Sequence, residues 1–172
     1  MQKIAFNIYF TLIISILAFS PSLAQVSLSV DVGPQIPNGD WSSRYNTGVG
    51  TNIKLKYMVD DFAIGVRTGF NSFKLDNSEN IQYRIVPITF DFSYYFTGSK
   101  VIPYLEGGFG AYINSYKVRD FSSRDSNRFG AHLGGGIWFD VAEAVDLGGG
   151  VQFNFLENTS YMGLNFGVKF DF

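Results

Sequence analysis

The chain ends with Tyr161-Met162-Gly163-Leu164-Asn165-Phe166-Gly167-Val168-Lys169-Phe170-Asp171-Phe172, in which large apolar residues alternate with small or charged ones. Side chains along a β-strand point alternately to opposite faces, so one face of this segment is apolar and the other carries glycine, asparagine, lysine and aspartate. A half-buried strand of a soluble protein can share this pattern. The alternation is also typical of a strand of a membrane β-barrel, and its recurrence along the chain separates the two possibilities.

The same alternation recurs in seven earlier segments, which span residues 26–32, 49–57, 62–70, 86–96, 105–113, 129–139 and 145–155. One face of each segment is built from valine, isoleucine, leucine and phenylalanine, whereas the other holds most of the glycines together with charged residues. No helical periodicity is visible after residue 24. The sequence therefore predicts an all-β fold, an eight-stranded antiparallel up-and-down transmembrane β-barrel.

The connections between these segments alternate in length. Residues 34–46, 74–80, 117–127 and 156–160 form polar and mostly long connections, whereas residues 59–61, 97–100 and 140–144 form tight turns. A transmembrane barrel with an even number of strands has both termini and its short turns on the periplasmic side, and its longer loops outside the cell. We expect the four longer connections to be extracellular.

A soluble lipocalin-like barrel is the main alternative, with the apolar side chains inside and the polar ones in water. The lumen of an eight-stranded barrel is only just wide enough for its side chains, so glycines beside a few charges fit it better than the phenylalanine-rich set does. Aromatic residues also gather at the strand ends, as expected for interfacial girdles; these are Tyr57, Phe62, Tyr94, Tyr95, Phe96, Trp138, Phe139 and Phe172. Both observations favour the membrane barrel.

The first 24 residues have the features of a secretory signal peptide. Lys3 precedes an apolar run, and Pro21-Ser22-Leu23-Ala24 provides a small-residue cleavage site. We expect cleavage after Ala24, which leaves residues 25–172 as one barrel domain. An exported barrel of this kind is expected in the outer membrane of a gram-negative cell.

The composition excludes several classes of function. The 172-residue chain has no cysteine, a formal net charge of −2 and a single histidine. Disulfides and thiolate metal sites are therefore excluded, and nothing in the charge favours nucleic acid. The mean hydropathy of +0.07 is too polar for a helical membrane protein but suits a barrel, in which every second residue faces lipid.

Three stretches carry a family resemblance: residues 85–96 (IVPITFDFSYYF), 103–112 (PYLEGGFGAY) and 163–172 (GLNFGVKFDF). In their order and spacing they resemble the small outer-membrane β-barrels of the porin family that are related to OmpX and OmpA. The resemblance implies that the terminal aromatics Phe170 and Phe172 act as an assembly signal, read by the barrel-assembly machinery. Pro87 lies inside a predicted strand and lacks an N–H donor, so we expect a local bulge or a late strand start there.

Four charged residues on the glycine-rich face are candidates for a network inside the lumen. Lys54, Arg67, Asp91 and Glu106 are expected at similar depth when positions are counted from the short-turn end of each strand. Two cations and two carboxylates would balance, and would plug the pore. The alternative is that they lie separately in lumen water or at an interface.

The sequence favours a non-enzymatic outer-membrane protein that serves envelope structure, adhesion or surface recognition through its loops. Arg119, Arg124 and Arg128 are candidate contacts for a surface ligand or for lipopolysaccharide phosphate. A lipid-modifying barrel enzyme is the competing possibility, with His132 as a base and Asp125-Ser126 of the preceding loop as its candidate partner. We expect no catalytic residue, cofactor or metal, and outer-membrane lipid as the surrounding partner.

Overall fold

A computed structural model describes residues 26–172, apart from residues 77, 97, 99, 119–120 and 158. The predicted signal peptide lies outside the described residues. The strands are β1 (Val26–Asn38), β2 (Gly48–Val59), β3 (Phe62–Leu75), β4 (Ser78–Tyr95), β5 (Val101–Val118), β6 (Phe121–Ala142), β7 (Val145–Leu156) and β8 (Thr159–Asp171), and a short 3-10 helix, η1 (Gly39–Trp41), follows β1.

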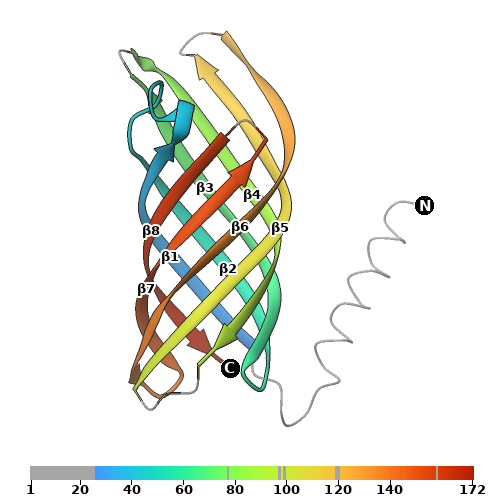
Figure 1. The fold of residues 1–172 in the computed structure, drawn as a ribbon, viewed down its shortest axis with the longest axis vertical. Helices are drawn as coiled ribbons and strands as arrows, with labels where there is room; N and C mark the ends of the chain where they lie inside the picture. The colour runs from blue at the N-terminus through green and yellow to red at the C-terminus, as the bar shows by residue number, and fades with distance from the viewer. Residues whose placement is uncertain (1–25, 77, 97, 99, 119–120, 158) are drawn as a thin grey trace, which may run out of the picture.

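Each strand pairs antiparallel with the next, and β8 pairs with β1, so the sheet closes into a barrel in the order β1 to β8 (Figure 1). The closing seam includes the pair Leu28–Phe170, and the Phe172 N–H donates a 2.9 Å hydrogen bond to the Val26 carbonyl. The predicted eight-stranded up-and-down barrel is confirmed. Closure leaves no free sheet edge within the wall.

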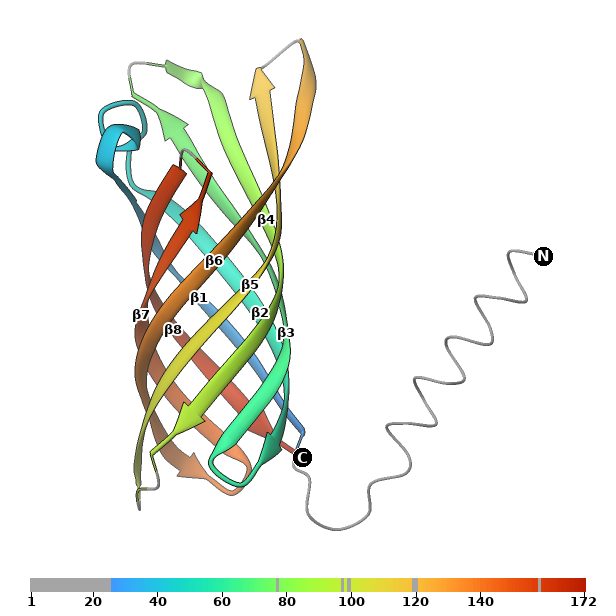
Figure 2. The same cartoon turned by 45° about the vertical axis from the view of Figure 1, so that its right-hand side comes forward.

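The short turns β2–β3, β4–β5 and β6–β7 lie at the same end of the barrel as the start of β1 and the end of β8 (Figures 1 and 2). This is the periplasmic end of an outer-membrane barrel, and the opposite mouth is extracellular. Two expectations at that mouth are wrong. The predicted connections 74–80 and 117–127 are mostly strand, because β3 and β4 remain paired as far as Leu75–Ser78, and β5 and β6 as far as Val118–Phe121.

The two faces of the wall differ as the alternation predicts. Large apolar side chains point outward and are exposed, including Phe129 at 71% and Phe166 at 66% of their surface, whereas Arg67 and Asp91 are buried inside. A soluble barrel with an apolar interior is therefore excluded, since its apolar side chains would have to lie in the lumen. The outward face is the one that meets lipid in a transmembrane barrel.

Among the residues that the structure describes, no helix has the length and apolarity needed to cross a bilayer.

Pro87 lies within β4 and causes no bulge. β4 starts at Ser78, well before Pro87, and the β3–β4 register is the same on both sides of it; the only shift in this pair lies between Lys74 and Leu75. The expected bulge or late start is therefore wrong. The pairing of β4 with β5 continues through Pro87–Tyr112. In the β3–β4 ladder, in contrast, Val86 and Pro87 have no register partner. A proline without an N–H can interrupt one ladder and leave the other intact.

Aromatic side chains fill both ends of the lumen. The cluster at the extracellular mouth, which we call the outer cluster, comprises Trp41, Tyr45, Phe73, Tyr83, Ile85, Tyr112 and Tyr161. η1 places Trp41 within this cluster, with ring centroids 4.7 Å from Phe73 and 5.2 Å from Tyr83. Edge-to-face contacts at these distances are favourable for aromatic rings. The β1–β2 connection therefore folds into the mouth.

A second cluster, the inner cluster, fills the periplasmic end with Ala63, Tyr95, Tyr104 and Trp138. The rings of Tyr104 and Trp138 stack with centroids 5.8 Å apart. The prediction that Tyr95 and Trp138 belong to an interfacial girdle is wrong, because both are buried in the lumen. Tyr95 lies an even number of residues after Asp91, so the alternation of side chains points both of them inward.

Candidate functional site

The middle of the lumen contains a group of acidic and basic side chains that we call the lysine cluster, formed by Asp31, Lys54, Lys56 and Glu106. Lys54 Nζ lies 2.8 Å from Glu106 Oε1 and 3.4 Å from Asp31 Oδ2. Lys56 Nζ lies 3.0 Å from Glu106 Oε2 and donates a 2.7 Å hydrogen bond to Ser93 Oγ. Two ammonium groups and two carboxylates balance, as buried charges require.

Toward the extracellular mouth lies a second group, the arginine cluster, formed by Arg67, Thr89, Asp91, Tyr112 and His132. Arg67 Nε donates to Thr89 Oγ1 at 3.3 Å, and the Thr89 hydroxyl in turn donates to Asp91 Oδ1 at 2.7 Å. Arg67 Nη2 reaches the Tyr112 hydroxyl at 3.2 Å. The guanidinium, which extends from β3, is thus held by groups on two other strands, β4 and β5.

The contact between Arg67 and His132 fixes the tautomer of the histidine. Arg67 Nη2 lies 3.0 Å from His132 Nδ1, and an arginine nitrogen can only donate a hydrogen bond. Nδ1 must therefore be the acceptor, and the proton of a neutral ring is on Nε2. His132 Nε2 lies 3.5 Å from Asp91 Oδ1, so the imidazole is positioned between the guanidinium and the carboxylate.

The four charges predicted to meet in the lumen all lie there, but in two groups. Lys54 contacts Glu106 directly, whereas Arg67 and Asp91 are joined through Thr89 and His132. In the described part of the chain, the hydrogen bonds and ion pairs join no member of one cluster to a member of the other.

Two members of the lysine cluster were missed by the sequence reasoning. Asp31 and Lys56 both lie on inward positions, since Asp31 is one residue from the outward Val32 and Lys56 is two residues after Lys54. Side-chain alternation along β1 and β2 is the signal that could have found them.

A further charged group lies at the periplasmic end of the lumen. Lys169 Nζ is 2.7 Å from Asp146 Oδ2 and 2.9 Å from Asp171 Oδ2, and it lies 5.5 Å from the centroid of the Tyr95 ring. This group links the sides of β7 and β8 to the inner cluster. From one end of the lumen to the other, inward side chains thus contact one another through ion pairs, hydrogen bonds and packed aromatic rings.

The surface-loop candidates are placed as follows. Arg119 lies outside the described residues, and Arg124 is in β6 as the register partner of Tyr116. Arg128 Nη1 donates to the Glu157 carbonyl and to Thr159 Oγ1, so it ties β6 to the β7–β8 connection. Phe170 and Phe172 point outward near the end of β8 and are exposed; their role in assembly stays a prediction.

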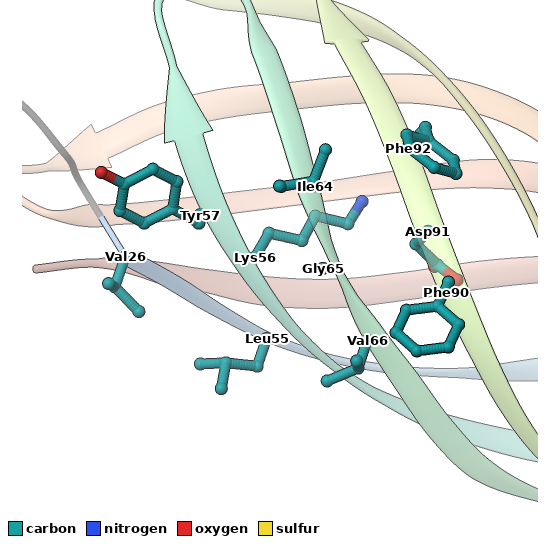
Figure 3. A pocket seen from close by; sticks show the side chains of 10 residues that line it. All are labelled: Val26, Leu55, Lys56, Tyr57, Ile64, Gly65, Val66, Phe90, Asp91 and Phe92. Carbon is teal, nitrogen blue, oxygen red and sulfur yellow. The ribbon is translucent and has the colours of Figure 1, made fainter. Parts of the chain in front are cut away.

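A shallow apolar groove lies on the outer wall near the periplasmic end (Figure 3). Its exposed surface comes from outward side chains of four adjacent strands, namely Val26, Leu55, Tyr57, Ile64, Val66, Phe90 and Phe92. Lys56 and Asp91 also line it, but their charged groups bind partners in the lumen on the other side of the wall. This groove is part of the lipid-facing surface, and its exposed lining, in the residues described, has no group of polar side chains that could form a binding or catalytic site.

Several solved structures are similar to this chain. Neisserial surface protein A is 21% identical, with a TM-score of 0.66, 88% of this chain covered and 98% of that one. Ail, the attachment invasion locus protein of Yersinia pestis, is 15% identical, with a TM-score of 0.62 and coverage of 88% and 100%. The N-terminal β-barrel domain of Pseudomonas aeruginosa OprF is 17% identical, with a TM-score of 0.54 and coverage of 85% and 97%. At these identities the likeness shows the fold.

No curated protein matches the sequence. The family model of the outer membrane protein β-barrel domain, in contrast, matches residues 10–172, which include every strand of the barrel. This match places the barrel in the outer membrane. This agrees with the predicted resemblance to small outer-membrane barrels. The closed eight-stranded wall, its apolar outer face and this match together show that the chain belongs to the outer membrane protein β-barrel domain family.

Proposed function

We propose that this protein is a non-enzymatic surface protein of the outer membrane, which serves adhesion or surface recognition through the sheet that projects from its extracellular mouth. The barrel acts as a rigid support for that sheet. Its lumen is filled by side chains that bind one another, so the interior offers structure rather than a wide aqueous path.

The observation that carries the proposal is the unequal height of the strands. The last pair between β6 and β7 at the extracellular end is Gly130–Leu156, whereas β6 stays paired with β5 from Phe129–Ala111 to Phe121–Val118. β4 accompanies β5 as far as the pair Ile81–Val118. These strands therefore rise above β7, β8 and β1 (Figures 1 and 2). In the part of the chain that the structure describes, the backbone of residues 121–129 pairs with β5 and not with β7. An open edge of this kind can pair with another chain.

The charge of the projecting hairpin suggests an anionic ligand. Its tip, residues 117–128, contains the basic residues Lys117, Arg119, Arg124 and Arg128 and the acidic residues Asp120 and Asp125. Arginine is suited to bidentate recognition of sulfate, phosphate and carboxylate groups. Among the similar structures, Ail of Yersinia pestis was solved in complex with a heparin analogue, sucrose octasulfate. For this chain we propose Arg119 and Arg124 as the recognition residues, because Arg128 is bonded to the β7–β8 connection.

The surroundings of His132 support a non-enzymatic role over a lipid-modifying one. Its ring is buried in the lumen and is held by Arg67 and Asp91, away from the outer surface where acyl chains lie. The serine considered as its partner, Ser126, is on the same strand about 20 Å away at the rise of an extended chain. A base needs its nucleophile within hydrogen-bond reach.

Cells that display the full chain test the proposal by their adherence to heparin-coated beads. We expect several-fold lower adherence for Arg119→Ser/Arg124→Ser. We expect a similar decrease when an Asn-Gly turn replaces residues 115–125, since Asn114 and Ser126 are register partners that such a turn can join. Arg44→Ser, which removes an exposed arginine of the β1–β2 connection, is the control and should adhere like the parent. Equal adherence of all variants at equal surface levels would contradict the proposal.

A further inference from the structure

The outer wall of the barrel carries two basic residues near its extracellular end. Ser72 of β3 pairs with Arg84 of β4, and Lys74 pairs with Gln82. The adjacent residues along each strand are buried in the lumen; they are Asn71 and Phe73 on β3, and Tyr83 and Ile85 on β4. Because side chains alternate, Phe70, Ser72, Lys74, Gln82 and Arg84 lie together on the lipid-facing side.

These residues lie at the height where the apolar band of the barrel ends. Below them, the outward positions of the same two strands include Val66, Ile88, Phe90 and Phe92, which are exposed and apolar. Tyr94 lies near the periplasmic end of β4. For a strand tilted by about 40°, the path from Tyr94 to Arg84 rises about 25 Å along the barrel axis, which is the height of the apolar band of such barrels. Arg84 is therefore level with the headgroups of the outer leaflet.

The Arg84 side chain is held in one position by its neighbours. Its Cζ lies 5.5 Å from the centroid of the Phe70 ring, and its Nη2 donates a 3.2 Å hydrogen bond to Gln82 Oε1. Its Nε is shielded from solvent and has no hydrogen-bond partner. The exposed donors of the guanidinium are therefore at its Nη atoms, and Nη1 makes none of the hydrogen bonds of the described residues. A guanidinium that is stacked on an aromatic ring and presents such a donor is preorganised to receive an oxyanion.

Lys74 supplies a second positive charge beside Arg84. The two residues are diagonal neighbours on one face of the β3–β4 pair, so they are separated by about 7–8 Å, within reach of long side chains. The lumen lysines Lys54, Lys56 and Lys169 all have carboxylate partners, whereas the ion pairs of the described chain include neither Lys74 nor Arg84. Among the residues whose side chains the structure describes, no carboxylate pairs with either of these two cations at the membrane interface.

We propose that Arg84, Lys74 and Phe70 form a docking site for the phosphorylated headgroup of an outer-leaflet glycolipid. Arg84 binds a phosphate through its guanidinium, Lys74 adds charge to the same headgroup, and Phe70 contacts the first carbons of an acyl chain. The lipid is favoured over a soluble anion because the site is continuous with the apolar wall below it. The site is on the barrel wall, so it is independent of the projecting sheet and of the adhesion proposed for it.

The experiment uses the mature protein refolded in a nonionic detergent, with bisphosphorylated lipid A as the probe and native mass spectrometry as the readout. We expect retention of lipid A to fall about tenfold in Arg84→Gln/Lys74→Gln. The control is Arg44→Gln/Lys100→Gln, which removes the same charge from exposed sites in the β1–β2 connection and the β4–β5 turn. Folding of every variant is verified by its gel shift on heating, and the single variants Arg84→Gln and Lys74→Gln replace the double one if it does not refold.

Three results would overturn the site. Equal loss in the control pair would show that net charge alone binds the lipid. Equal retention of dephosphorylated lipid A would remove the role of phosphate. Displacement of lipid A by millimolar inorganic phosphate would assign the site to a soluble anion. Phe70→Ala is expected to weaken retention of lipid A by a few-fold. Unchanged retention would show that the Phe70 ring is not part of the site.

Discussion

Lys54 Nζ lies 2.8 Å from Glu106 Oε1 across the lumen, and the two residues belong to β2 and β5, which are not neighbours in the sheet. The contact therefore connects opposite parts of the wall. Since Lys56 shares the same carboxylate, Glu106 is the anion on which two buried ammonium groups depend.

Glu106→Gln should therefore destabilise the barrel strongly, by about 3–5 kcal/mol, because it leaves the buried Lys56 without a carboxylate partner and Lys54 with Asp31 alone. Urea unfolding of the protein in detergent measures this. In a double-mutant cycle, Lys54→Met with Glu106→Gln should cost less than the sum of the single changes. Glu106 with Arg67 should be closer to additive, since the two side chains belong to different clusters; strong coupling there and none with Lys54 would contradict this assignment.

Thr89→Val should lower the free energy of unfolding by about 1–3 kcal/mol, because the Thr89 hydroxyl joins Arg67 to Asp91 and its removal deprives Arg67 Nε of its acceptor and Asp91 Oδ1 of a hydrogen-bond donor. Thr68→Val is the matched control. Thr68 is on the adjacent strand, paired with Ile88, and its side chain faces lipid, where valine is tolerated. Equal effects of the two substitutions in chemical unfolding would show that the hydroxyl has no bridging role.

Trp138 should be shielded from both lipid and water, because its ring is in the lumen with Tyr104. In Trp41→Phe, where Trp138 is the sole tryptophan, fluorescence should be little quenched by brominated lipids or by iodide. Phe139→Trp in the background of Trp41→Phe/Trp138→Phe places the indole on the exposed outer face and should be quenched by brominated lipid. If brominated lipid quenched Trp138 as strongly as the tryptophan of Phe139→Trp, Trp138 would have to lie in an interfacial girdle and not in the lumen.

Ala144→Gly should stabilise the barrel by about 1 kcal/mol. Ala144 has a φ of 64°, a left-handed conformation that costs energy for a residue with a Cβ and is readily adopted by glycine. Ala142→Gly, at the end of β6 where φ is negative, should be neutral or destabilising. Thermal unfolding of both variants tests the difference, and a lower stability of Ala144→Gly would show that the turn tolerates its alanine without strain.

The number of strands and the direction of their side chains follow from the sequence alone. The alternation in the segments from Val26 to Phe172 has a period of two, which is a local property of extended backbone, and the size of the residues on each face decides which face fits a narrow lumen. The inward positions of Lys54, Arg67, Asp91 and Glu106 follow from this. The same alternation also points Tyr95 and Trp138 inward, although their position at strand ends is typical of an interfacial girdle.

Only the tertiary structure decided which side chains meet. Lys54 pairs with Glu106, and Arg67 with Thr89 and His132, because the stagger of the strands around the barrel sets the height of each residue, and long side chains can cross the lumen. The inward position of Trp41 and the continuation of β4, β5 and β6 above the mouth also depend on contacts between segments distant in sequence. Alternation along one strand fixes a direction but not a height, so it cannot specify a partner on another strand.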